Sequence, residues 1–186
     1  DKYFDLANNN IKKYNPPRKD LVIVIDYTKN ILMDRLYLLD MKTNKVILES
    51  RVSHAWNSGY LYPNDLSNDI NTKKTSGGNY ITLNKYLRGR FGNGLRVKGL
   101  DKGINDNALK RAIVFHSDKS LKAKWSWGCF ATPEEINKDI DAYYAERNMF
   151  LDNYSGNRFD GLVEWNKKNA KRLEALNTEN ANQQIT

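Results

Sequence analysis

The 186-residue chain has a formal net charge of +8, and its residues are 40% hydrophobic and 11% aromatic. This length fits one ordinary domain with a short appended piece. The longest apolar run, residues 21–25, is far shorter than the roughly 20 residues that cross a bilayer, so we expect no transmembrane helix. The first residues lack the basic start and apolar stretch of a signal peptide, so we expect a cytoplasmic protein or one whose signal or anchor was removed.

The positive charge favours an anionic partner, such as nucleic acid or the anionic bacterial wall. A solvated basic face without any ligand is an equally good interpretation. Many lysines are dispersed among glutamates and asparagines near the C-terminus, and no dense block of Lys and Arg occurs. This dispersal argues against a nucleic-acid partner.

The single cysteine, Cys129, excludes an internal disulfide and a cysteine cluster for zinc or iron–sulfur. Since His54 and His116 are the only histidines, we expect no metal site. A lone cysteine is most often a small buried hydrophobe. A functional role for Cys129 therefore depends on the sequence around it.

The first half of the chain reads as a helix followed by strands. The apolar spacing of residues 3–13 predicts a helix, which the asparagine and two prolines of residues 15–17 end. Residues 21–27 form a predicted buried strand, and a polar turn joins a predicted hairpin of residues 35–40 and 45–52.

Residues 54–78 are rich in Asn, Ser, Asp and Gly and form a predicted long loop, a feature that is often functional. Residues 80–83 and 95–97 are short predicted strands with glycines between them. Residues 112–115 form a further buried strand that ends at His116.

After Cys129 the pattern becomes helical. Thr132 is the predicted N-cap, Pro133 the first helical position and Glu135 the acidic residue three positions after the cap. We expect this helix to reach about residue 150, a break at residues 153–156, a second helix over residues 161–176, and no further strand. The predicted fold is mainly β or α+β with a helical C-terminal region. The predicted parts are a helical lead-in (1–20), a catalytic domain (21–150) and a helical C-terminal extension (151–186).

His116, at a strand end, and Cys129, preceded by Gly128, have the residue types of a cysteine nucleophile with its base. A thiolate attacks a carbonyl, so a neighbour must lower the pKa of the thiol or accept its proton. A glycine permits a tight turn that brings backbone N–H groups to a developing oxyanion. A helix that begins just after Cys129, together with Lys122 and Lys124, would favour the thiolate.

Structural interpretations of the same residues stay open. A histidine at a strand end is more often structural, and Ser117 and Ser126 are typical of turns in which a hydroxyl bonds its own backbone. Aromatic residues near the predicted site are core candidates, although a subset would pack against sugar or peptide if they flank a cleft: Trp56, Tyr60, Tyr62, Trp125 and Trp127.

The Ser-Trp-Gly-Cys motif of residues 126–129, with His116 upstream, resembles the Ser-x-Gly-Cys signature of YkuD-type L,D-transpeptidases. The similarity is closest to the murein L,D-transpeptidase catalytic domain branch. Matching segments occur in the same order between residues 46 and 135: 52–54, 57–59, 76–80, 95–100, 103–108 and 111–116.

The resemblance implies a β-sandwich-like domain in which Cys129 attacks an L,D peptide bond of a peptidoglycan tetrapeptide stem and releases D-alanine. The acyl group would then pass to the amine of a second stem, which gives a 3→3 cross-link. His116 would move the proton, a carbonyl near Ser117 would orient the imidazole, and backbone N–H groups of Trp127, Gly128 and Cys129 would form the oxyanion hole. No cofactor is implied.

The sequence departs from the family at Ala131, where many members have an arginine, and at Phe130, where the similar branch has proline. The carboxylate recognition of that arginine therefore does not carry over. His54, Tyr80 and Trp125 are predicted substrate-binding residues, and a structural role for His54 is an equal alternative.

Three other functions remain as alternatives. The same residues would serve an L,D-carboxypeptidase or hydrolase, in which water takes the acyl group. A wall-binding module with a vestigial site, or a nucleic-acid binder, belongs to another class. Because peptidoglycan stems lie outside the cytoplasmic membrane, the resemblance implies a periplasmic or secreted enzyme, and it also implies acylation by carbapenems. Protein partners are not predicted.

Overall fold

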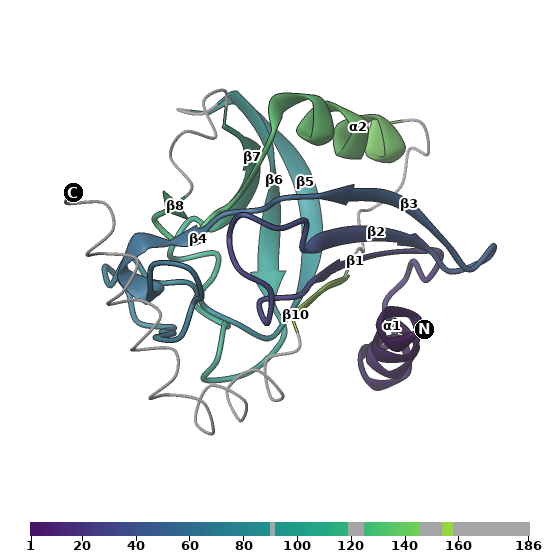
Figure 1. Cartoon of the computed structure of the whole chain (residues 1–186), viewed down its shortest axis with the longest axis horizontal. Coiled ribbons are helices and arrows are strands. Elements are labelled where there is room, and N and C mark those ends of the chain that lie inside the picture. Colours follow the sequence, from purple (N-terminus) through teal and green to yellow (C-terminus); the bar gives the residue numbers. More distant parts are fainter. Residues whose placement is uncertain (90–91, 119–124, 146–153, 158–186) are drawn as a thin grey trace.

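The computed structural model describes residues 1–89, 92–118, 125–145 and 154–157 (Figure 1). The helices are α1 (Lys2–Tyr14), the 3₁₀ helix η1 (Trp56–Ser58) and α2 (Glu134–Ala145). The strands are β1 (Leu21–Ile25), β2 (Leu36–Asp40), β3 (Lys45–Ser50), β4 (His54–Ala55), β5 (Asn79–Gly89), β6 (Gly92–Gly99), β7 (Val114–Ser117), β8 (Trp125–Ser126), β9 (Phe130–Thr132) and β10 (Tyr154–Asn157). None of the helices in these ranges has the length and apolar character needed to span a membrane.

Eight strands form one sheet in the order β3-β2-β1-β10-β5-β6-β7-β9, and β4 pairs with β8 in a separate two-stranded sheet. Most neighbours are antiparallel, but β1 with β10, β7 with β9, and β4 with β8 run parallel. Figure 1 places β4 and β8 at one side of the molecule, away from α1. Two of the parallel pairs, β7–β9 and β4–β8, flank the segment that carries Cys129.

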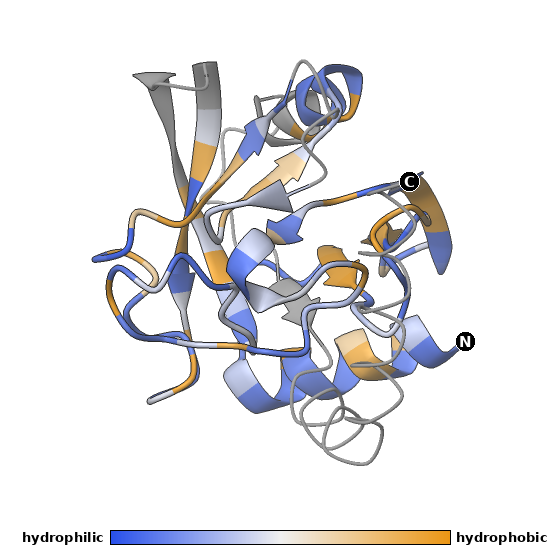
Figure 2. Ribbon diagram, turned by 60° about the vertical axis from the view of Figure 1, so that its left-hand side comes forward, coloured by the Kyte–Doolittle hydropathy of each residue, from blue (hydrophilic) through white to orange (hydrophobic). Residues whose placement is uncertain are grey.

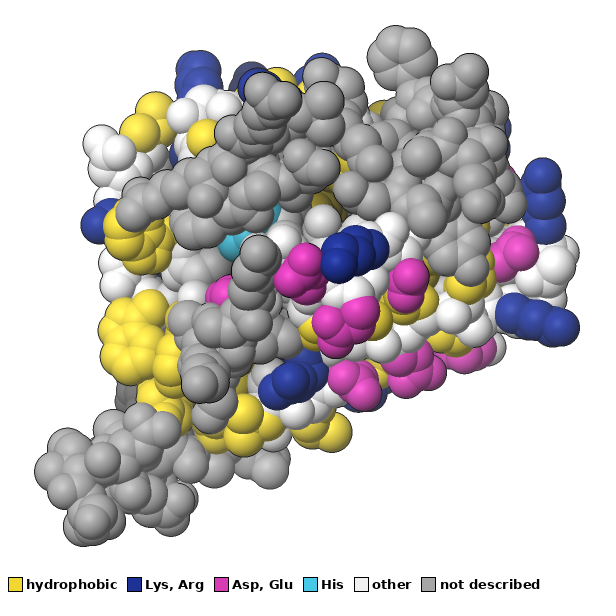
Figure 3. All heavy atoms as spheres, turned by 90° about the horizontal axis from the view of Figure 1, so that it is seen from above, with side chains coloured by type: hydrophobic (Ala, Val, Ile, Leu, Met, Phe, Trp, Pro, Cys, Tyr) yellow, Lys and Arg dark blue, Asp and Glu magenta, His cyan; other side chains and the backbone are white. Residues whose placement is uncertain are grey.

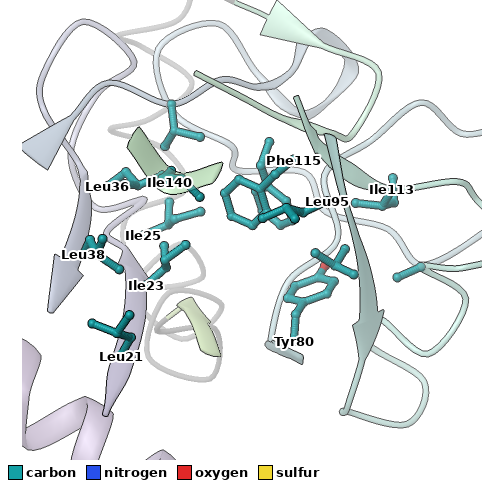
Figure 4. Packing of buried hydrophobic residues seen from close by; sticks show 14 of the residues in the cluster. Leu21, Ile23, Ile25, Leu36, Leu38, Tyr80, Leu95, Ile113, Phe115 and Ile140 are labelled. Carbon is teal, nitrogen blue, oxygen red and sulfur yellow. The ribbon is translucent and has the colours of Figure 1, made fainter. Parts of the chain in front are cut away.

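The five residues of β1 are all buried because the strand faces a hydrophobic cluster on each side. Leu21, Ile23 and Ile25 belong to the main core, whereas the alternate residues Val22 and Val24 belong to a smaller cluster. Alternation along a strand sends successive side chains to opposite faces. Figure 4 shows the main core between two facing parts of the sheet, with the β1 and β2 residues opposite those of β5, β6 and β7.

Helix α1 covers the smaller cluster. Its buried residues Tyr3, Phe4 and Ala7 pack with Val22 and Val24, and the rest of the helix is largely hydrophilic (Figure 2). The Tyr3 hydroxyl donates a 2.7 Å hydrogen bond to a carboxylate oxygen of Asp26, just past the end of β1. Asn15 ends the helix in the left-handed conformation (φ 43°), and its N–H bonds the Ile11 carbonyl.

Helix α2 covers the main core from the other side through Ile140, which is buried, and Ile136, one turn earlier. Acidic residues gather on the face of the molecule over α2 (Figure 3). Glu134 and Glu135 lie in the first helical turn, where the helix dipole favours negative charge. The net positive charge is therefore not spread evenly over the surface.

The structure confirms the mainly β or α+β fold, the first helix, the first strand and the β2–β3 hairpin. The predicted short strands of residues 80–83 and 95–97 are parts of a longer hairpin, β5–β6. The prediction of no strand after α2 is wrong, because β10 lies between β1 and β5 in the sheet. The helix predicted over residues 161–176 lies outside the described residues, and the boundaries at residues 20 and 150 stay predictions.

The helix predicted from Thr132 as N-cap and Pro133 as first residue is confirmed to within one residue, because α2 begins at Glu134, but its start does not lie directly beside Cys129. The strand β9 intervenes and carries the chain about 10 Å further before α2 begins at Glu134. Thr132 does not cap the helix, because its hydroxyl is buried without a hydrogen-bond partner. The positive end of α2 is therefore not adjacent to the sulfur.

Candidate active site

His116 stands on β7 and is 5% exposed. Its Nδ1 lies 2.9 Å from the carbonyl oxygen of Ser117, as the resemblance implies. Burial lowers the pKa of His116, while the Ser117 carbonyl and the charge of Asp118 act in the opposite direction. The imidazole is therefore neutral at pH 7, and the proton on Nδ1 that donates to the carbonyl makes Nε2 the basic nitrogen.

Cys129 is half-buried and directly precedes β9, which runs parallel to β7. Phe115 pairs with Phe130 and His116 with Ala131, so Cys129 lies beside the β7 strand, close to Val114. Cys129 lies two residues before Ala131, the partner of His116 on the neighbouring strand. The Cα atoms of Cys129 and His116 are therefore about 8 Å apart. The two predicted catalytic residues thus come from segments that the sheet brings together.

The thiol of Cys129 faces the backbone of β7 and the residues before it. Its Sγ lies 3.7 Å from the carbonyl oxygen of Ala112. Burial raises the pKa of the thiol, whereas a backbone hydrogen bond from Val114 and the charge of Arg111 lower it, with a net upward shift. Of the two predicted ways to activate the thiol, this direction favours a neighbour that accepts its proton over a lowered pKa of the thiol.

The turn from Ser126 to Cys129 is held by its own side chains. The Ser126 hydroxyl donates to the Cys129 carbonyl (2.7 Å) and accepts from the Gly128 N–H (3.1 Å). Gly128 has φ 116°, and a Cβ there would lie 3.0 Å from both Ile113 Cδ1 and the Lys74 carbonyl oxygen. A glycine is therefore required, and Ser126 has the turn-stabilising role that its residue type favours.

The predicted oxyanion hole changes in one respect. The N–H of Gly128 points to Ser126 Oγ, so it is engaged within the turn. The N–H groups of Trp127 and Cys129 are the remaining predicted donors. Lys122 and Lys124, predicted to add positive charge at the thiol, lie outside the described residues.

Sequence reasoning missed two residues that support the site, and the first of them holds this turn. Ser53 is buried, its hydroxyl donates to the Cys129 carbonyl (3.1 Å) and accepts from the Ala131 N–H (3.0 Å), and its own N–H bonds the Ala131 carbonyl (2.9 Å). It belongs to a segment that matches the family, which was the available signal.

Arg111 is the second missed residue. Its Nη1 donates to the Ser67 carbonyl and to Ser76 Oγ, both at 2.9 Å, and its Nη2 donates to the Lys74 carbonyl. The guanidinium thereby ties the long loop to the start of the His116 strand and lies near the thiol, whose pKa it lowers. Like Ser53, it belongs to a segment that matches the family (residues 111–116), which was the available signal.

Two predicted substrate-binding residues are buried in the structure, which argues against direct contact with a substrate. His54 has no exposed surface: Arg35 Nη2 lies 3.0 Å from its Nδ1, and its Nε2 lies 2.8 Å from the Gly59 carbonyl oxygen. Burial and the charge of Arg35 lower the pKa of His54 to about 3. Tyr80 is also fully buried, packs edge-on against Phe130 and bonds Ser76. The burial of His54 favours its structural interpretation, and Tyr80 belongs to the main core.

Trp125, the third predicted substrate-binding residue, is half-buried on β8. Its ring lies 4.5 Å from that of Trp56 and 5.0 Å from that of Tyr60, measured between centroids. Trp56 and Trp127 are 54% and 63% exposed, so the interpretation of these two as core residues is wrong. Among the described residues, no group of His, Cys, Asp or Glu side chains is placed to hold a metal ion.

The family model of the L,D-transpeptidase catalytic domain matches residues 2–152. Because this match covers most of the chain, the protein belongs to the family of L,D-transpeptidase catalytic domains, as its motifs predict. No curated protein matches the chain.

Several solved structures are similar to the chain. An L,D-transpeptidase from Mycobacterium tuberculosis H37Rv has 12% identity and a TM-score of 0.44 over 74% of this chain and 57% of that one. One from Mycobacterium smegmatis has 13% identity and a TM-score of 0.41, covering 74% and 58%. One from Xylanimonas cellulosilytica DSM 15894 has 13% identity and a TM-score of 0.40, covering 76% and 63%. The chain thus spans about three fifths of these proteins, and the family assignment rests on the family match alone.

Proposed function

We propose that the protein is a cysteine-dependent L,D-transpeptidase that acts on tetrapeptide stems of peptidoglycan, with Cys129 as nucleophile and His116 as base. The observation that carries this proposal is the pairing of β7 with β9, which brings an oriented imidazole beside the strand that follows the cysteine. The tight turn at Gly128, held by Ser126 and Ser53, supports the same role.

The directions of the two pKa shifts favour a neutral pair over a preformed thiolate. A neutral imidazole accepts the thiol proton as the sulfur attacks the carbonyl of the third stem residue. The C–N bond to the terminal D-alanine then breaks, and the imidazolium of His116 returns the proton to the leaving amine. The product of this step is a thioester on Cys129.

In the second step, the side-chain amine of another stem attacks the thioester carbonyl. His116 takes the proton of the attacking amine, the C–S bond breaks, and the thiol is regenerated with that proton. A new amide joins the two stems. The N–H groups of Trp127 and Cys129 are the proposed donors to the oxyanion in both steps, where a fixed donor contributes about 10²- to 10³-fold in rate.

Two further proposals depend on this reaction. Because the stems lie outside the cytoplasmic membrane, we propose a periplasmic or secreted location for the mature enzyme. Since carbapenems present a reactive carbonyl to the same thiol, we also propose that they acylate Cys129, which intact-protein mass would reveal as a single adduct.

The proposed function is tested by mass analysis of the products after wild type and Cys129→Ala are incubated with purified tetrapeptide muropeptides. Cross-linked dimers that lack one D-alanine, formed only by the wild type, are expected. Tripeptide monomers alone would identify an L,D-carboxypeptidase instead. Unchanged substrate in both samples would overturn the proposal and leave a wall-binding module as the alternative.

A further inference from the structure

An exposed aromatic surface lies next to the cysteine turn. We call it the indole surface and define it as Trp56, Tyr60, Trp125 and Trp127. Hydrophobic side chains gather at the left of the face in Figure 3, the side on which Figure 1 places β4 and β8. More than half of Trp56 and of Trp127 is exposed, at 54% and 63%. Large exposed aromatic groups in a cluster are typical of interaction sites.

The rings of the indole surface are held in place from several sides. Trp56 makes edge-on contacts with Trp125 and Tyr60, at centroid distances of 4.5 Å and 5.9 Å. The Trp125 indole N–H donates to the Tyr60 carbonyl (2.9 Å), and β8 is paired to β4. A rigid ring loses little conformational entropy when a ligand binds, which suits a recognition surface.

Lys73 holds the other exposed indole. Its ammonium lies 4.3 Å from the centroid of the Trp127 ring. Lys73 itself has φ 53°, a left-handed conformation that a residue with a side chain rarely adopts. Backbone strain of this kind persists where the surrounding structure fixes it, and it often occurs at ligand-binding loops.

We propose that the indole surface binds the amino-sugar strand of peptidoglycan and so places the attached stem at Cys129. The inference rests on the proposed function and adds a site for the glycan to it. A sugar ring has an apolar C–H face and a rim of polar groups. It therefore matches flat indoles that have N–H edges and polar neighbours such as Asn57 and Lys73.

The length of a stem agrees with this placement. Cleavage after the third stem residue leaves three residues between the thiol and the sugar, which alone span about 11 Å when extended. Trp127 is two residues from Cys129, at most about 7 Å between Cα atoms, and Trp125 is four residues away, at most about 14 Å. The indole surface therefore lies within the distance from the thiol that an attached stem allows for the glycan strand.

The test uses the full chain with Cys129→Ala and glycan strands from which the stems have been removed, so that no acyl transfer takes part. Binding is measured by the change in intrinsic tryptophan fluorescence. We expect saturable binding that Trp56→Ala weakens by about tenfold or more, whereas Trp56→Phe, which keeps a flat ring, retains most of it. Leu32→Ala, which removes another exposed side chain (50%), is the matched control and should bind as the parent does.

Three outcomes would overturn the inference: no saturable binding of stem-free glycan, equal binding by Trp56→Ala, or self-association of the protein that Trp56→Ala abolishes. The last would assign the surface to a second copy of the chain. Acyl transfer without glycan binding would refute this inference alone. Glycan binding without acyl transfer by the wild type would refute the proposed chemistry alone.

Discussion

His54 and His116 lie in two regions of the protein that hold an imidazole in different ways. His54 is on β4, has no exposed surface and is engaged at both ring nitrogens, by Arg35 and by the Gly59 carbonyl. His116 is on β7, where the Ser117 carbonyl fixes Nδ1 and makes Nε2 the basic nitrogen. His54 thus joins two segments of the fold through hydrogen bonds. His116 is instead oriented beside β9, the strand that follows Cys129.

Because the two histidines have different surroundings, we expect their lowered pKa values to have different consequences. Burial lowers the pKa of both imidazoles. In His54 the neutral form is part of a buried hydrogen-bond network, so its protonation would act on stability. In His116 the neutral form is the proposed base, so its protonation would act on the rate.

The largest expected effect is on catalysis through His116. Replacing it with alanine removes the group that accepts the thiol proton, and we expect acyl transfer to fall by about 10²- to 10⁴-fold. The free energy of unfolding should change much less than the activation free energy does. Transfer rates on tetrapeptide stems and denaturant unfolding check this, and a variant with nearly wild-type turnover would remove His116 from the mechanism.

The next largest effect is on stability through His54. Alanine there removes one acceptor of Arg35 Nη2 and the donor to the Gly59 carbonyl, and it creates a cavity, so we expect the free energy of unfolding to fall by about 2–4 kcal/mol. His54→Gln keeps an acceptor and a donor and should recover part of the loss. Denaturant unfolding measures both variants, and a loss confined to the rate would place His54 in the chemistry instead.

The pH dependence of stability sharpens the comparison. The pKa of His54 is about 3 in the folded protein and 6.5 in an ordinary environment. Between these values the unfolded chain binds a proton that the folded protein does not bind. The contribution of neutral His54 to the free energy of unfolding is therefore fully present above about pH 6.5. It is lost toward pH 3, by about 1.4 kcal/mol per pH unit.

Unfolding experiments at pH 7, 6 and 5 test this prediction in the wild type and in His54→Gln. The variant should lack most of the slope that His54 contributes, although His116, whose pKa is also lowered, contributes in both proteins. Equal slopes in the two proteins would show that His54 does not control the acid sensitivity of the fold.

The smallest expected effect concerns Arg111, whose charge lowers the pKa of the Cys129 thiol. Arg111→Ala should raise that pKa and slow thiol alkylation at fixed pH by about two- to tenfold. Arg111→Lys keeps the charge but loses part of the contacts to the long loop. It therefore separates the effect of the charge on the thiol pKa from the effect of the hydrogen bonds on the loop. A thiol pKa unchanged in Arg111→Ala would show that the guanidinium acts on the loop alone.

The parts that could be predicted from sequence are those with a local signal. The apolar run of β1, the polar turn between β2 and β3, and the Ser-Trp-Gly-Cys motif each depend on consecutive residues. The position of β10 could not be predicted, because a short segment with a glycine has little propensity of its own and becomes a strand by pairing with β1 and β5.

The environment of the site was also beyond local patterns. Ser53 and Cys129 are joined by a hydrogen bond across 76 positions of the sequence, and Arg111 binds Ser67 across 44. The burial of His54 and Tyr80 and the raised pKa of the thiol arise from such contacts. A motif predicts the reacting residues, whereas their protonation depends on the packing of distant segments.

The most direct test of the account is the pH dependence of acyl-enzyme formation on a tetrapeptide stem, measured in single turnovers by intact-protein mass. The wild type should show an acid limb with a midpoint below the ordinary histidine value of 6.5. His116→Ala should lose that limb along with most of the rate, and His54→Gln should keep it. A limb unchanged in His116→Ala, or one shifted by His54→Gln, would contradict the assignment of the base to His116.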